Sequence, residues 1–104
     1  INDAVINAFK GGFSDIDIEY LPDRQCTTIE FRMDRRSVTH RMVPLHISKN
    51  ILSRLRVMAR LQPGPYHKPR IRRIQFGEYA PLDIEVAVAF MPTNRGMEKA
   101  QIHL

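Results

Sequence analysis

The chain has 104 residues, enough for one domain with a modest core, and its 43% hydrophobic content is ordinary for a globular protein. Its one cysteine, Cys26, excludes an internal disulfide and a cysteine-based metal site, and no apolar stretch is long enough to cross a bilayer. Sixteen Lys and Arg residues against eleven Asp and Glu residues give a net charge of +5. This excess favours an anionic partner, and nucleic acid, nucleotide phosphate, acidic lipid and an acidic protein subunit all fit it.

The N-terminal part of the chain predicts a helix followed by three strands. Residues 1–9 place their apolar members on one helical face, and Gly11-Gly12 follow, which accept the left-handed conformation of a helix end. Residues 14–19 alternate apolar and acidic side chains, the period of a half-buried strand. Residues 27–34 alternate in the same way and predict the second strand of a hairpin, and residues 38–43 predict a third strand.

A second helix is predicted from Ile47 to Gln62, with Ser48 as its N-cap and Pro63-Gly64-Pro65 ending it. At 3.6 residues per turn its apolar side chains fall on one side: Ile51, Leu52, Leu55, Met58 and Ala59. Its basic side chains fall together on another side: Lys49, Arg56 and Arg60. The pattern indicates a helix that packs on the core and shows a cationic stripe to the surface.

The C-terminal part predicts three more strands. Residues 69–76 read as a basic strand, residues 82–90 as an apolar strand buried on both sides or nearly so, and residues 99–104 as a last strand after a loop at residues 92–96. The order is helix, three strands, helix, three strands. We therefore expect a single α+β domain over residues 1–104, with a mostly antiparallel sheet and the helices packed on one face.

Three acidic residues in the first predicted strand, Asp15, Asp17 and Glu19, fall on one face of that strand. Three carboxylates in a row can bind a divalent cation or perform acid–base chemistry. They can equally form the solvated face of an amphipathic strand, paired across the sheet with Arg or Lys. The pattern favours the second interpretation, because no histidine or cysteine ligand lies nearby in the sequence.

Other catalytic or metal-binding patterns are absent from the sequence. The chain has four histidines, namely His40, His46, His67 and His103. No two of them have the short spacing of zinc ligands. Cys26 lies in a predicted strand or turn without an activating helix N-terminus. Neither the Gly-x-x-x-x-Gly-Lys-Ser/Thr phosphate loop nor the Gly-x-Gly-x-x-Gly loop occurs. The chain by itself is therefore not expected to bind and hydrolyse ATP by the phosphate-loop route.

The remaining candidate is the basic surface. One group surrounds the strand at residues 69–76: Lys68, Arg70, Arg72 and Arg73. Arginine presents a planar fork suited to phosphate or carboxylate. Nucleic-acid binding usually adds exposed aromatic rings, but the phenylalanines occupy apolar positions typical of a core: Phe9, Phe31, Phe76 and Phe90. A solvated face, an anionic protein and a nucleotide all remain compatible with the group.

Several segments resemble the N-terminal domain that precedes the motor domain in the ATPases of type II secretion and type IV pilus assembly. Ser53–Leu61 closely matches the family's S-R-I-K-V-M-A-x-L helix, the most specific of the matches. Ser14–Tyr20 is similar to its A-S-D-I-H-I-E-P strand, and Glu30–Arg35 to its R-x-R-I-D-G turn. Met91–Lys99 and Ile102–Leu104 are similar to M-P-T-x-x-G-E-K and the closing R-L-L. The matches cover nearly the whole chain in the family's order.

The resemblance implies a role for arginines of this domain, which in the family are thought to reach nucleotide phosphates bound to the motor. Arg73 matches such a position, and Arg70 and Arg72 adjoin it. Two other arginine positions of the family fall at Ala87 and His103. Any nucleotide contact is therefore expected to rest on Arg73, with Arg70 or Arg72 as candidates to replace the arginine missing at Ala87.

The resemblance further implies a PAS-like fold and a mechanical role. The chain, which begins without methionine, is expected to be part of a longer ATPase whose motor domain binds ATP and Mg, while this part binds neither alone. Its expected partners are the motor domains of its own and neighbouring subunits of a homo-hexamer, reached through Lys49, Arg56 and Arg60, and platform proteins of the inner membrane. The expected location is the cytoplasm, at the inner membrane through those partners.

Two alternatives from other classes stay open. One is a free-standing basic α/β module that binds RNA or DNA, and the other is a small-ligand sensor of the PAS type. A pocket filled by Phe and Met side chains would exclude the sensor.

Overall fold

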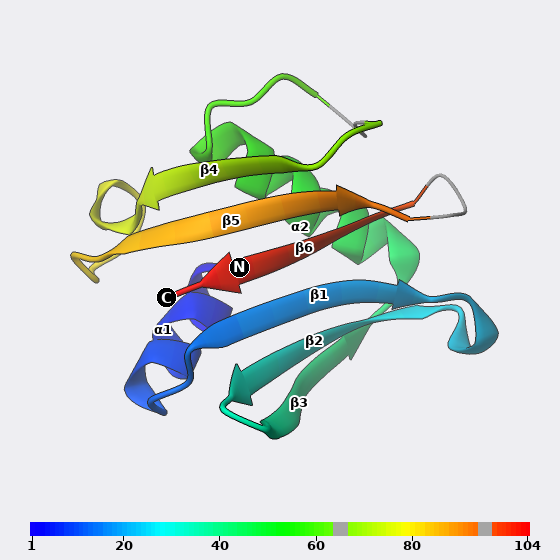
Figure 1. The fold of residues 1–104 in the computed structure, drawn as a ribbon, viewed down its shortest axis with the longest axis horizontal. Coiled ribbons are helices and arrows are strands. Elements are labelled where there is room, and N and C mark those ends of the chain that lie inside the picture. The colour runs from blue at the N-terminus through cyan, green and yellow to red at the C-terminus, as the bar shows by residue number, and fades with distance from the viewer. Residues whose placement is uncertain (64–66, 94–96) are drawn as a thin grey trace.

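Six strands form one antiparallel sheet in the computed structural model, which describes residues 1–63, 67–93 and 97–104 (Figure 1). The helices and strands are α1 (Asn2–Lys10), β1 (Asp15–Leu21), β2 (Cys26–Met33), β3 (Arg36–Val43), α2 (Leu45–Met58), β4 (Arg70–Gln75), β5 (Glu85–Pro92) and β6 (Glu98–His103). Two short 3-10 turns lie at Pro22–Arg24 and Phe76–Glu78. This is the predicted order of helix, three strands, helix, three strands, and the α+β class is confirmed.

The first and last strands pair at the centre of the sheet. The strand order is β3-β2-β1-β6-β5-β4, so two consecutive three-stranded sets are joined by the antiparallel β1–β6 pair. Both helices lie behind the sheet in Figure 1 and cover the same face. The arrangement is compatible with the PAS-like fold that was expected. None of the described helices is long and apolar enough to span a membrane.

Side chains alternate along each strand between the two faces of the sheet, one packed against the helices and the other without helices. In β1, Ile16 and Ile18 are fully buried against the helices, while Glu19 is exposed. In β5, Val86, Val88 and Phe90 are buried toward the helices, and the alternate positions are half-buried. The strand was predicted to be buried on both sides or nearly so. One face of β5 is buried, and Ala87 and Ala89 on the other face are half-buried because neither described helix covers that face.

Phe9 is not a core residue, contrary to the prediction. Its side chain is 46% exposed, while Ala4, Val5 and Ala8 make the buried face of α1. The other three phenylalanines of the set, at positions 31, 76 and 90, are buried as expected. A helix of nine residues offers a narrow buried face, and Phe9 lies at its margin.

The predicted start of the second helix is wrong. Helix α2 begins at Leu45 with Pro44 as its N-cap, because Pro44 has the extended conformation that ends a strand and admits a helix directly after it. Ser48 lies inside the helix, 3% exposed, and its hydroxyl donates a hydrogen bond of 2.8 Å to the Leu45 carbonyl. The helix ends at Met58, before Pro63, and the other two residues of the predicted stop, Gly64 and Pro65, lie outside the described residues.

Both helices end in a left-handed residue. Gly12 has φ of +77° after α1, as predicted, and the Phe13 N–H bonds the Ala8 carbonyl at 3.0 Å. Arg60 has φ of +57° after α2, and the Leu61 N–H bonds the Arg56 carbonyl at 2.9 Å. Arg60 thus occupies a backbone position at which glycine is usual.

Replacing Arg60 by glycine is expected to raise the free energy of unfolding by about 1 kcal/mol, because glycine adopts the left-handed conformation without a clash of Cβ. Arg60→Ala is the matched control, since it removes the same exposed charge and keeps Cβ. Urea denaturation measures both variants. Equal stability of the two would contradict the explanation.

Candidate functional site

One row of side chains crosses all six strands on the face without helices. The strand register places these residues opposite one another from β3 to β4: Ser37, Arg32, Asp15, His103, Ala87 and Arg73. The three positions at which the resemblance predicts arginine, namely Arg73, Ala87 and His103, therefore lie on adjacent strands. Neighbouring Cα atoms in such a row are about 5 Å apart. We treat this face, called the open face below, as the candidate site.

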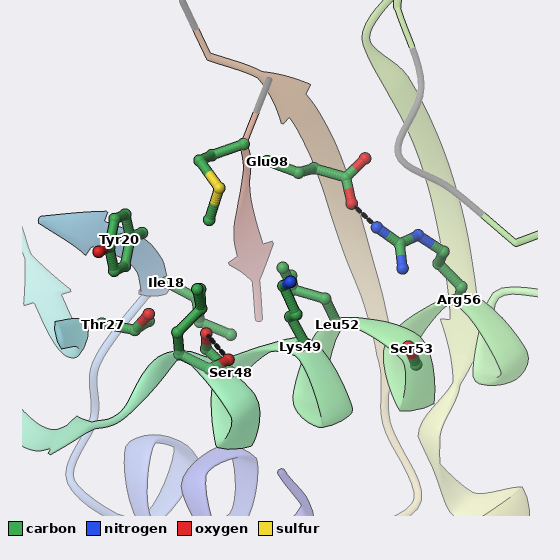
Figure 2. Close-up of a pocket in the computed structure, with 11 residues that line it drawn as sticks. Ile18, Tyr20, Thr27, Ser48, Lys49, Leu52, Ser53, Arg56 and Glu98 are labelled. Atoms are coloured by element: carbon green, nitrogen blue, oxygen red, sulfur yellow. Dashed lines mark hydrogen bonds and ion pairs between the residues drawn. The ribbon is translucent and has the colours of Figure 1, made fainter. Parts of the chain in front are cut away.

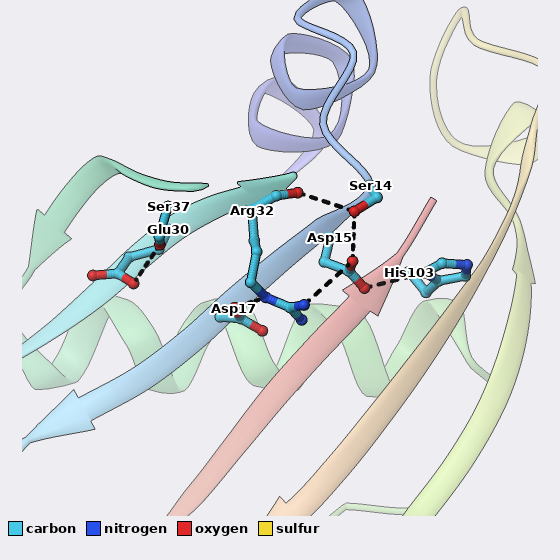
Figure 3. A network of polar contacts seen from close by, with 7 residues as sticks. All are labelled: Ser14, Asp15, Asp17, Glu30, Arg32, Ser37 and His103. Atoms are coloured by element: carbon cyan, nitrogen blue, oxygen red, sulfur yellow. Dashed lines mark hydrogen bonds and ion pairs between the residues drawn. The ribbon is translucent and has the colours of Figure 1, made fainter. Parts of the chain in front are cut away.

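Asp15 is the buried centre of the row (Figure 3). It is 8% exposed, and the Ser14 hydroxyl donates a hydrogen bond of 2.7 Å to its Oδ2. His103 Nδ1 lies 3.1 Å from its Oδ1, and Arg32 Nη1 lies 3.7 Å from its Oδ2. Burial by itself would raise the pKa of Asp15, but the hydrogen bonds of Ser14 and His103 and the charge of Arg32 outweigh burial and lower the pKa below its ordinary value.

The acidic strand forms cross-strand pairs, as the favoured interpretation predicted. Arg32 Nε donates to Asp17 Oδ2 at 3.0 Å, and this contact raises the pKa of Arg32. Glu19 is exposed at the far end of β1, and its carbonyl accepts from the Thr28 hydroxyl at 3.5 Å. Within residues 1–63, 67–93 and 97–104, no three His, Cys, Asp or Glu side chains are grouped as metal ligands.

The histidines and the cysteine are scattered, as predicted. The His40 ring stacks on Phe31 with ring centroids 4.4 Å apart, and burial, followed by the charge of Arg41, lowers the pKa of His40. His46 and His67 are exposed, and Cys26 is a half-buried free thiol at the start of β2.

The arginines of β4 do not lie together. Arg73 is on the open face, and its Nη1 donates to Glu85 Oε1 at 2.9 Å. That hydrogen bond, and a second from Gln75, lower the pKa of Glu85. Arg70 and Arg72 alternate to the helix side, where they share parity with the buried Ile74. Arg70 and Arg72 therefore lie on the opposite side of the sheet from Arg73 and Ala87, and a nucleotide contact through them stays a prediction.

Arg56 does not belong to an exposed stripe. It is 8% exposed, forms an ion pair with Glu98 of β6, itself 6% exposed, and lies 5.9 Å from the Phe90 ring centroid. The prediction failed because Arg56 is four residues after Leu52 and so shares the face of that core residue. The spacing from Leu52 was the signal in the sequence that Arg56 is buried. The positive charge of Arg56 is tolerated in the interior because the carboxylate of Glu98 compensates it.

The other two residues of the predicted stripe reach the surface. Lys49 is exposed on α2, and Arg60 follows the helix, where its Nη2 lies 3.4 Å from Glu78 Oε2. Exposed basic side chains of the helix side include Lys49, Arg54, Arg60, Arg70 and Arg72. On the open face, acidic side chains outnumber Lys and Arg among the strand residues: Asp15, Asp17, Glu19, Glu30 and Glu85 against Arg32, Arg73 and Lys99. The basic surface expected from the composition therefore lies on the helix side.

The fold and the row of residues define an α+β domain whose open face carries arginine. Comparison of its sequence with known proteins indicates which protein class the domain is related to. No protein-family model matches the chain. The type IV pilus assembly ATPase PilB of Pseudomonas aeruginosa is 31% identical to it over 98 residues, which is 92% of this chain. The match supports a relation to the type IV pilus and secretion ATPases. The chain spans only 17% of the length of that relative.

Replacing Glu98 by glutamine is expected to lower the free energy of unfolding by about 3 kcal/mol, because it leaves the Arg56 cation buried beside a neutral group. Adding Arg56→Met to this variant removes the cation as well, so the double variant is expected to lose less than the sum of the two single losses. Urea denaturation of the three variants measures the coupling. Strictly additive losses would contradict the buried ion pair.

Stability is expected to fall in acid through Asp15. Its pKa is lower in the folded chain, so its contribution is present above the ordinary aspartate pKa of about 3.9 and is lost as pH falls below that value toward the folded pKa. The free energy of unfolding between about pH 6 and pH 3 should therefore fall more steeply for the natural chain than for Asp15→Asn. Ser14→Ala removes one hydrogen bond to Asp15, so its free energy of unfolding should fall with a steepness between those of the natural chain and Asp15→Asn. Identical slopes would refute the assignment.

Proposed function

We propose that the chain is the domain preceding the motor in a hexameric ATPase of type IV pilus assembly or type II secretion. The relation to PilB over nearly the whole chain supports the family, and the α+β fold agrees with it. The role is mechanical. The domain packs against motor domains and transmits the motion that accompanies nucleotide binding and release, while the motor holds ATP and Mg.

The observation that carries the proposal is the row on the open face. Arg73, Ala87 and His103 occupy adjacent strands, so positions that are scattered in the sequence form one contact area. Arg73 is the member that can grip a phosphate by two parallel hydrogen bonds. Its side chain is 80% exposed, and its pair with Glu85 is a surface ion pair, which contributes little to stability. Exchange of Glu85 for a nucleotide phosphate therefore costs little.

The opposite side of the domain offers a second contact. Lys49 and Arg60 lie on the helix side, with Arg70 and Arg72 on the same side of the sheet. A cationic surface suits an acidic surface of a neighbouring subunit and speeds association. One domain could thus contact the motor of its own subunit with one face and a neighbour with the other. In the cell the assembly would work in the cytoplasm, against platform proteins of the inner membrane.

Replacing Arg73 by alanine in the full-length protein that carries this chain is expected to lower kcat of ATP hydrolysis about 100-fold, the effect of removing one charge-stabilising donor. Arg24→Ala is the matched control, because Arg24 is an exposed arginine of the Pro22–Arg24 turn, outside both proposed contacts, and its loss should leave kcat nearly unchanged. Steady-state ATPase assays of the hexamer measure both. Equal effects of the two variants would contradict the assignment of the open face.

The nucleic-acid alternative predicts a different result for the 104-residue chain alone. Titration with mixed-sequence oligonucleotides at about 50 and 200 mM salt would then give submicromolar affinity and a steep loss with salt. Weak binding at both concentrations agrees with the ATPase-domain proposal.

A further inference from the structure

A pocket of about 330 Å³ lies on the helix side, between the first turns of α2 and the adjoining ends of β1, β2 and β6 (Figure 2). Its apolar wall comes from Ile18, Leu45, Leu52 and Met97. The volume is at the lower end of the range of small-molecule sites, about 300–1,000 Å³. Met97 is the one Phe or Met side chain among the described lining residues, and it leaves the pocket open, so the condition that would exclude a ligand sensor is not met.

A buried hydroxyl without a partner lines the pocket. Thr27 is 1% exposed, and among the described residues its Oγ1 has no hydrogen-bond partner. Most buried polar groups in proteins are hydrogen-bonded, and leaving one unpaired costs free energy. A polar group on a bound molecule would supply the missing partner. The neighbouring Ser48 hydroxyl already donates to Leu45, so it is available only as an acceptor.

The ammonium group of Lys49 lies at the pocket, and no ion pair to it is found among the described residues. Lys49 is exposed and lines the pocket. The other cation of the lining, Arg56, is paired with Glu98, so the two cancel. The charged lining residues Lys49, Arg56 and Glu98 therefore leave one positive charge for a ligand.

We propose that this pocket binds a small organic carboxylate with an apolar body. The apolar body would lie against Ile18 and Leu52, the carboxylate would pair with the Lys49 ammonium, and a polar group near the strand end would bond the Thr27 hydroxyl. The concave position between helix and sheet suits a small molecule better than a protein surface. The inference does not rest on the proposed ATPase function, because the pocket lies on the side of the sheet opposite Arg73.

Hexanoate and benzoate, each with its neutral amide, are the probes for an NMR titration of the isotope-labelled 104-residue chain. Saturable shifts of the Thr27, Ser48 and Leu52 amides with the carboxylates are expected. Lys49→Gln should weaken hexanoate binding at least about 5-fold, the loss of one exposed charge contact, and should leave hexanamide binding unchanged. Arg54→Gln is the matched control, an exposed cation of the same helix outside the pocket, and should change neither.

Three results would overturn the proposal. They are no saturable shift in the millimolar range, equal binding of hexanoate and hexanamide, and equal weakening by Lys49→Gln and Arg54→Gln. Thr27→Val provides a second test inside the pocket, since it keeps the shape of the side chain and removes the hydroxyl. It should weaken binding of 6-hydroxyhexanoate more than that of hexanoate, and equal weakening would contradict the assigned role of Thr27.

Discussion

The pairing of β1 with β6 is the constraint on which the rest of the structure depends. Asp15–Ile18 pairs antiparallel with Ala100–His103, so the first and last strands form the centre of the sheet. On the helix side this pairing places Ile16 beside Ile102, both fully buried, and unites one core from the two halves. On the open face it places Asp15 beside His103, which continues the row from β2 to β4. A shift of one residue would reverse both faces at once.

The two faces of this sheet have different chemistry. The helix side holds the core, the Arg56–Glu98 pair, the pocket and a group of exposed basic side chains. The open face holds acidic residues together with Arg32, Arg73 and Lys99. The two proposed contacts, a small molecule in the pocket and a nucleotide phosphate at Arg73, would therefore fall on opposite sides of the sheet. Because both faces share the strands β1 and β6, their geometry is nevertheless set by one register.

Much of the fold could be predicted because it depends on local periodicity. Strand alternation gave the six strands, and Gly12 gave the end of α1, since each signal lies within a few neighbouring residues. The predictions that failed depend on distant partners or on faces. Arg56 is buried because it pairs with Glu98, 42 residues away. Strand alternation also places Arg72 and Arg73 on opposite sides of the sheet, although they are adjacent in the sequence. The row on the open face requires strand order and register, which a single sequence does not contain.

The most direct test of the central claim is a cryo-EM reconstruction of the full-length protein with a non-hydrolysable ATP analogue. The account predicts that the open face turns toward a motor domain and that the Arg73 guanidinium lies within hydrogen-bond distance, about 3 Å, of a nucleotide phosphate oxygen. A reconstruction in which the open face contacts solvent, or in which α2 faces the nucleotide, would contradict it.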